Sequence, residues 1–171
     1  VFVIIRAMSG NAIQKAYARF LMTSIGKTIV SEQRQLLSVL QDREALAKLD
    51  PGTLGRRYLD FTEKEAITAD GLAAASEDDQ PIKDPGLRLY AERTRDMHDL
   101  WHVITDYGRD TFGESCLLAF TYAQTKNRGV GVIALVGLAK ITKEIGSGVG
   151  SAMWQAYQAG RRAEWLPAQD W

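Results

Sequence analysis

Residues 87–107 constrain the fold most, because this stretch contains neither Pro nor Gly and its apolar residues recur at helical spacing. We therefore predict a helix over this range. His98 and His102 stand four residues apart on it, so both imidazoles lie on one face and can close on a single ion. Asp99 lies about 100° round the helix from His98, still within reach of that ion. The pattern predicts a metal-binding cluster.

A second carboxylate, Glu114, follows His102 by twelve residues and would lie roughly 18 Å away if the helix continued. Gly108 and Gly113 mark a place where the chain can turn back. We therefore predict that Glu114 opens the next helix and faces the histidines as a further ligand. The chain has only two histidines in 171 residues, and their place beside two acidic residues favours a metal site over an ordinary core or surface pair.

Two nitrogens and one or two carboxylate oxygens suit zinc first, with iron, cobalt and manganese open and magnesium less favoured. If Asp99 is a ligand, the protein supplies four donors and the site can be closed and structural. If Asp99 does not coordinate the ion, the protein supplies only three donors. One coordination position then stays open for water or substrate, and Asp99 can transfer a proton. Zinc metalloproteases carry Glu where this chain has Asp99, so a zinc-dependent hydrolase is a weaker alternative.

Three segments resemble one family. The first segment is the metal motif: His98-Asp99-x-x-His102, followed after eleven residues by Glu114. It resembles the metal signature of the Coq-four family of coenzyme Q (ubiquinone) biosynthesis proteins. Residues 51–56, followed by Tyr58, resemble its Gly-Thr-Leu-Gly-Arg segment, and residues 90–98 resemble its approach to the metal motif. The resemblance is good over about residues 50–127 and looser in the flanks.

The resemblance implies an all-helical protein that acts late in ubiquinone synthesis on a polyprenylated aromatic ring. It implies metal-dependent oxidative removal of the ring carboxylate at C1 and its replacement by hydroxyl, organisation of the biosynthetic complex, or both. Arg56 is then a candidate contact for an anionic substrate group, with an ordinary salt bridge as the other interpretation, and Arg95 is a second candidate. The implied partners are a prenyl lipid, other ubiquinone biosynthesis proteins, a membrane surface bound peripherally and a second copy of the chain. A non-catalytic prenyl-lipid-binding scaffold is the main alternative.

Composition narrows the class of protein. Twenty-one basic and twenty-one acidic residues cancel, so no global field favours nucleic acid or an anionic membrane. Cys116 is alone, which excludes an internal disulfide and is typical of a buried thiol in a reducing compartment. A reducing compartment suits a cytoplasmic protein, and the family resemblance implies peripheral membrane association, on the matrix face of the inner membrane if the protein is mitochondrial. No leader with a cleavage site is visible, and a chain that begins at Val1 leaves open whether its termini are complete.

The chain is expected to form one all-α domain over residues 1–171, a bundle of about seven helices with an apolar groove or tunnel. The expected helices cover residues 9 or 11 to about 24, then 31–49, 54–64, 87–107, 114–126, the apolar run 130–139, and 151–165. Pro51 and Gly52 end the second helix. Residues 73–85 are acidic and carry two prolines, which predicts an exposed loop.

The run 130–139 is the most apolar part of the chain, but its ten residues are about half of what a bilayer crossing needs. Glycines in this run and after it predict that another group approaches the helix backbone closely. That group is either a neighbouring core helix or a long apolar ligand. In the second case the candidate lipid contacts are Val132, Leu135 and Val136. The last expected helix has a broad aromatic face that includes Trp154 and Trp165, and Arg161, Arg162 and Trp171 suit a membrane or partner interface.

Overall fold

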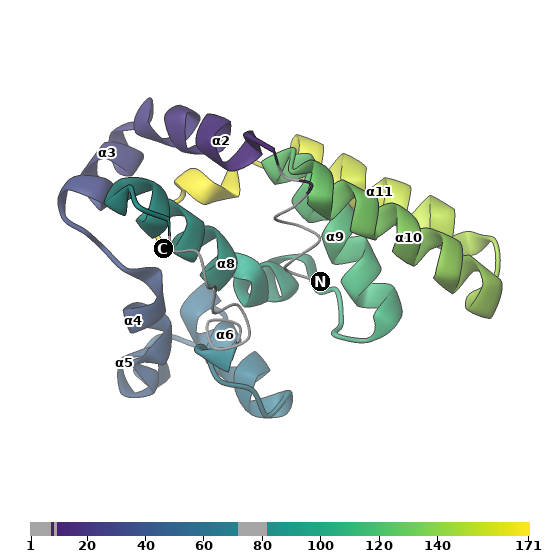
Figure 1. The fold of residues 1–171 in the computed structure, drawn as a ribbon. Coiled ribbons are helices and arrows are strands. Elements are labelled where there is room, and N and C mark those ends of the chain that lie inside the picture. Colours follow the sequence, from purple (N-terminus) through teal and green to yellow (C-terminus); the bar gives the residue numbers. More distant parts are fainter. Residues whose placement is uncertain (1–7, 9, 72–81) are drawn as a thin grey trace. The chain divides into compact units, whose positions relative to one another are not determined.

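The computed structural model describes residues 8, 10–71 and 82–171, and the described elements are all helical. The apolar run over residues 1–5, whose sequence fits either a strand or the end of a helix, lies outside these residues. So do the alternative helix start at Ser9 and residues 73–81 of the predicted loop. The helices are α2 (Ala12–Leu21), α3 (Ser24–Ser31), α4 (Leu36–Gln41), α5 (Arg43–Ala47), α6 (Leu54–Lys64), α8 (Pro85–Thr105), α9 (Thr111–Thr125), α10 (Arg128–Ile145) and α11 (Gly148–Arg162), followed by the 3₁₀ turn η1 (Leu166–Ala168) (Figure 1). The predicted all-α class is confirmed.

The structure adds two helices to those predicted. The first predicted helix ends early, at Leu21, and an unpredicted helix, α3, follows it, capped by the Thr23 side chain, which accepts a hydrogen bond from the Gly26 amide. The helix predicted over 31–49 starts late, because Gln33 has a φ of 52°, and it is divided where the Asp42 side chain accepts from the Ala45 amide to start α5. Capping side chains therefore override a nearly continuous apolar pattern. The described residues form nine α-helices instead of seven.

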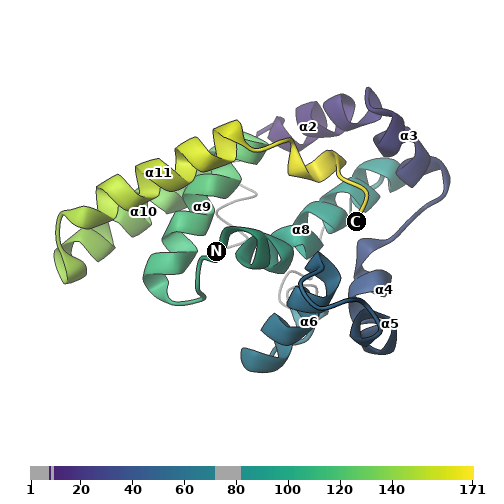
Figure 2. The same cartoon turned by 180° about the vertical axis from the view of Figure 1, so that it is seen from behind.

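The chain folds into two compact units. Unit 1 contains residues 1–20 and 107–169, and unit 2 contains residues 21–106 and 170–171. Unit 1 is built on α9, α10 and α11, which lie side by side in both views of the ribbon (Figures 1 and 2). Unit 2 is built on α8, with α3, α4 and α6 packed against it. The prediction of a single domain over residues 1–171 stays a prediction.

In unit 2, α8 is the long helix predicted from the sequence. The Asp84 side chain caps its start by accepting a hydrogen bond from the Leu87 amide at 2.6 Å. The helix ends at Asp106, which adopts the left-handed conformation with a φ of 60°. Met97, Leu100 and Trp101 on α8 are buried, so the helix forms the core of its unit.

In unit 1, close helix contact depends on small residues. A Cβ built on Gly160 of α11 would lie 2.7 Å from the Phe120 carbonyl oxygen and 2.9 Å from the Ala123 Cβ, both on α9. On α10, a Cβ at Gly131 would lie 3.0 Å from the Tyr122 ring. Close packing therefore explains the glycines on this part of α10 and α11. Cys116 is buried in the same core, and burial raises the pKa of its thiol.

The helices of the described residues are also too short or too polar to cross a bilayer. None of them combines the necessary length with an uninterrupted apolar character.

We predict that Gly160→Ala lowers the free energy of unfolding by about 1–3 kcal/mol, because the new methyl group overlaps backbone atoms of α9 that have no room to move. The measurement is urea unfolding followed by circular dichroism. Gly148→Ala is the matched control, since no atom lies within 4 Å of a Cβ built there. Equal loss of stability in the two variants would contradict close packing at Gly160.

Candidate metal centre

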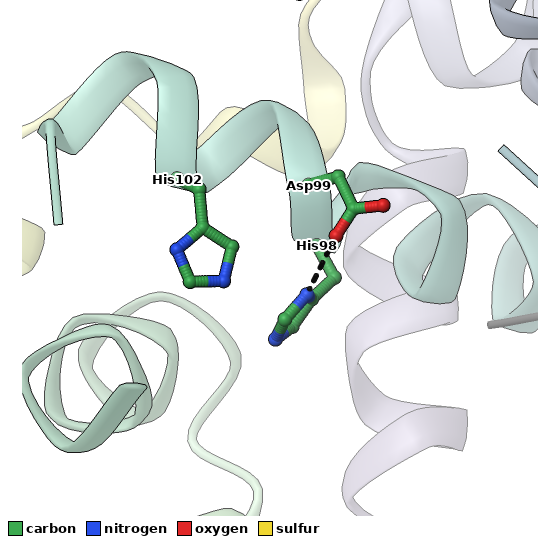
Figure 3. Close-up of side chains that lie close together, drawn as sticks. All are labelled: His98, Asp99 and His102. Carbon is green, nitrogen blue, oxygen red and sulfur yellow. Dashed lines mark hydrogen bonds and ion pairs between the residues drawn. The ribbon is translucent and has the colours of Figure 1, made fainter. Parts of the chain in front are cut away.

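The candidate centre lies on the C-terminal half of α8. His98, Asp99 and His102 each offer a ligand atom, and these atoms all lie within 4.8 Å of one another. Figure 3 shows the three side chains on one stretch of the helix, with the two imidazoles one turn apart. The structure therefore brings together three of the four predicted ligands by helix geometry alone.

A hydrogen-bond contact joins two members of the cluster. The Nδ1 atom of His98 lies 3.2 Å from the Oδ1 atom of Asp99 (Figure 3). Because Nδ1 faces this carboxylate, the Nε2 atom of His98 lies on the opposite edge of the ring. A carboxylate in this position fixes the tautomer and orientation of a ligand histidine.

His102 is positioned by aromatic packing. Its ring stacks on Phe61 of α6, with centroids 5.8 Å apart and an angle of 20° between the planes. It meets the His98 ring edge-on, at a centroid distance of 4.9 Å. His102 is 1% exposed, so α6 holds this imidazole in a defined place on α8. Phe61 was not predicted from the sequence, and its only signal there was an aromatic residue on the helix after the Gly-Thr-Leu-Gly-Arg segment.

Tyr58 is a second residue of α6 near the cluster to which the sequence pattern assigned no role. Its side chain is buried, and its hydroxyl has no hydrogen-bond partner among the described residues. Burial raises the pKa of this hydroxyl, and the negative charges of Asp99 and Asp96 raise it further. Tyr58 is therefore a neutral donor beside the acidic side of α8.

The two candidate arginines are both engaged in ion pairs. The Arg95 guanidinium contacts Asp96 through Nε and Nη2, at 2.8 Å in each case. Burial raises the pKa of Asp96, and the bond from Arg95 opposes that rise. Arg56 on α6 pairs with Asp60 at 3.1 Å and donates to the Ala47 carbonyl at 3.0 Å, as the salt-bridge interpretation expects. A role for either arginine in substrate binding stays a prediction.

Glu114 lies in the first turn of α9, as predicted for a residue that opens the return helix. The Asp110 side chain caps this helix by accepting hydrogen bonds from the Phe112 and Gly113 amides, at 2.9 and 3.1 Å. Gly113 is required here because a Cβ would collide with the Gly108 carbonyl oxygen. Glu114 belongs to unit 1 and the histidines to unit 2, so Glu114 as a metal ligand stays a prediction.

The candidate lipid contacts lie on α10. Val132 and Leu135 line an apolar groove of about 810 Å³ formed by α9, α10 and α11. The third candidate, Val136, is 64% exposed and lies outside the residues that line the groove.

Comparison with known protein families shows to which family the chain belongs. Residues 3–171 match the family described as "Coenzyme Q (ubiquinone) biosynthesis protein Coq4". The chain belongs to the Coq4 family.

Individual relatives agree with this Coq4 assignment. The chain is 32% identical over 120 residues to the mitochondrial ubiquinone biosynthesis protein coq4 of Schizosaccharomyces japonicus, a match that covers 70% of this chain and 47% of the relative. It is 29% identical over 113 residues to the mitochondrial COQ4 protein of Yarrowia lipolytica, covering 66% of this chain and 42% of the relative. The matched regions therefore span less than half the length of these two relatives.

The Coq4 chain also resembles a solved structure. A crystal structure of a Nostoc punctiforme protein, assigned provisionally to ubiquinone biosynthesis, superposes with a TM-score of 0.66 and 23% sequence identity. The match covers 92% of this chain and 72% of the other. At this identity the likeness shows a common fold.

We predict that Tyr58→Phe raises the free energy of unfolding of the metal-free chain by about 1 kcal/mol, because a buried hydroxyl without a partner carries an unrecovered desolvation cost. The measurement is urea unfolding in the presence of a chelator. Tyr90→Phe is the control, at a buried tyrosine of α8 that engages other groups, and should give no gain. A loss of stability in Tyr58→Phe would show that its hydroxyl is already hydrogen-bonded.

Proposed function

We propose that this chain holds one divalent metal ion, zinc first, and acts with it on a polyprenylated aromatic precursor of ubiquinone. The observation that carries the proposal is the convergence of His98, Asp99 and His102 within 4.8 Å in a member of the Coq4 family. Glu114 completes the proposed ligand set from α9.

The donors suit such an ion. Neutral imidazole and carboxylate are the nitrogen and oxygen ligands that zinc, iron, cobalt and manganese accept in proteins, whereas magnesium prefers oxygen alone. Asp99 and His102 are 7% and 1% exposed. Polar groups at that depth are costly unless they are satisfied. Coordination of an ion would engage His102, and the contact with His98 Nδ1 engages Asp99.

In this proposal Asp99 lies beside the ion and orients a ligand. Its Oδ1 atom faces Nδ1 of His98, which turns the Nε2 atom of that ring toward the ion. The protein then supplies three ligands, His98, His102 and Glu114, and a fourth position is open to substrate or water. Asp99 can also accept or return a proton from this position.

The bound ion would supply Lewis acidity to the carboxylate or phenolate oxygens of the ring as carbon dioxide leaves. Replacement of the ring carboxylate by hydroxyl consumes one water and releases carbon dioxide, one proton and two electrons. The reaction therefore needs an external two-electron acceptor. The groove on α9, α10 and α11 would hold the isoprenoid tail, with Val132 and Leu135 as contacts.

A non-catalytic role in assembling the biosynthetic complex is the second candidate. The observation that favours it is the exposure of large apolar side chains on α10 and α11: Leu135 is 66% exposed, Val136 64% and Trp154 59%. Surfaces of this kind commonly bind a partner protein or a membrane.

The curated relatives are named as mitochondrial proteins, so we propose the matrix face of the inner membrane as the location. Other ubiquinone biosynthesis proteins are the proposed partners. We also propose a homodimer, which size-exclusion chromatography of the purified chain tests.

A zinc-dependent hydrolase ranks third. Its reaction would use an ion-bound water and a general base in the place of Asp99, where Asp has a shorter reach than Glu.

We predict one equivalent of transition metal in the gently purified chain and none in His98→Ala, measured by mass spectrometry. The same substitution, and Glu114→Ala, should also abolish ubiquinone production in cells that depend on this chain. Arg88→Ala is the matched control, because Arg88 is an exposed residue of the same helix outside the cluster. Full ubiquinone production with metal-free His98→Ala would contradict a catalytic ion and favour the scaffold.

We predict that Asp99→Asn retains one equivalent of zinc but binds it about 10–100-fold more weakly, because an amide orients His98 less well than a carboxylate does. Competition against a coloured chelator measures the affinity. Complete loss of zinc from Asp99→Asn would instead make Asp99 a ligand and the site closed.

A further inference from the structure

Unit 1 contains a second hollow, of about 540 Å³, whose lining is basic. Four of its described lining residues are Lys15 and Arg19 from α2, Lys126 from the link between α9 and α10, and Arg128 from the first turn of α10. No described acidic residue lines it. None of these four side chains belongs to the histidine cluster, and of the four only Arg128 also lines the apolar groove.

Within the described part of the chain, no acidic side chain forms an ion pair with any of these four cations. Lys15 and Arg19 stand at i and i+4 on α2, whose ten residues include no acid. Like charges at this spacing weaken a helix. The pair Lys15 and Arg19 therefore costs α2 some stability.

Aromatic rings hold two of the cations in position. The Arg19 guanidinium carbon lies 4.0 Å from the centroid of a Trp165 ring. The Lys126 ammonium lies 5.3 Å from the Tyr157 centroid and 5.9 Å from the Tyr122 centroid. A π face attracts a cation without cancelling its charge, so both groups are drawn toward the wall of the hollow and remain available to an anion.

A buried glutamine fixes the ring beneath Arg19. The carbonyl of Gln124 accepts a hydrogen bond from Trp165 Nε1 at 3.1 Å. Its side-chain oxygen accepts from the Leu166 amide at 2.9 Å, and its side-chain nitrogen donates to the Gly160 carbonyl at 2.6 Å. Trp165 is therefore tied to the end of α9, and the wall of the hollow is preorganised.

The start of α10 adds positive potential. Asn127 caps this helix, and its side-chain oxygen accepts from the Gly129 and Val130 amides. The N-terminal end of a helix carries partial positive charge, and Arg128 at the first position adds a full one. An anion bound in the hollow would offset both.

The basic hollow adjoins the apolar groove. Met8, Tyr122 and Arg128 line both of them. A ligand with a charged head in the basic hollow could therefore extend an apolar chain along α10 and α11.

We propose that the basic hollow is a binding site for a phosphate ester. A phosphate monoester carries up to two negative charges and three acceptor oxygens, which match several fixed cations better than a single carboxylate does. The ester is either a water-soluble phosphate compound or the head of a lipid whose chain enters the groove.

Isothermal titration with methyl phosphate and octyl phosphate tests the site, because the two probes share a head group and differ in the chain. The first variant is the double substitution Lys15→Gln with Arg19→Gln. Its charge-matched control is Arg161→Gln with Arg162→Gln, at two exposed residues of the same unit that do not line the hollow. Lys126→Asn is a second variant, since Asn tolerates the left-handed conformation found at this position.

The expected result is one site per chain, with affinity reduced roughly tenfold or more in the Lys15/Arg19 variant and in Lys126→Asn. The control pair should stay within about twofold of the unmodified chain. Equal affinity for the two probes supports the site with a soluble ligand, and tighter octyl phosphate supports it with a lipid. The absence of binding by both probes, equal loss in the control pair, or octanoate binding as tightly as octyl phosphate would overturn the proposal.

Discussion

The burial of ionisable side chains along α8 is the constraint on which unit 2 depends. Arg93, Asp96, Asp99 and His102 are between 1% and 7% exposed on this helix. Transfer of such groups out of water is costly unless each finds a partner. Burial lowers the pKa of the Arg93 guanidinium to about 10 and raises that of Asp96, and both directions disfavour the charged form. A helix that served only as a core element would carry apolar residues at these positions, so the charged face indicates a site.

Unit 1 follows a different rule, since its helices approach closely at glycine. Gly160 and Gly131 let α11 and α10 lie against α9, and this close packing leaves large apolar residues facing outward. The same three helices therefore supply both the core of the unit and the wall of an apolar groove. The two interpretations of the glycine-rich segment, close packing and a groove wall, are compatible, because Gly131 both packs against Tyr122 of α9 and lines the groove.

Local features of the structure were predictable from the sequence, and features that depend on tertiary contact were not. Helical spacing placed His98, Asp99 and His102 on one face of α8, because that geometry is set within a single turn. The stacking of Phe61 on His102 depends on how α6 packs on α8, and no local pattern encodes that register. The basic hollow joins Lys15 to Lys126 across more than a hundred residues, so sequence spacing gave no signal for it. The break at Asp42 has a capping residue, but the apolar periodicity of residues 31–49 favoured one longer helix, and α3 (Ser24–Ser31) was not predicted at all.

X-ray absorption at the zinc edge of the chain loaded with one equivalent of zinc tests the central claim most directly. The account predicts imidazole scattering from two histidines, with the remaining first neighbours oxygen at about 2.0–2.2 Å. Loss of the imidazole signal in His102→Ala should accompany that result. Sulfur among the first neighbours, or a shell of water oxygens alone, would contradict a metal centre at His98, Asp99 and His102.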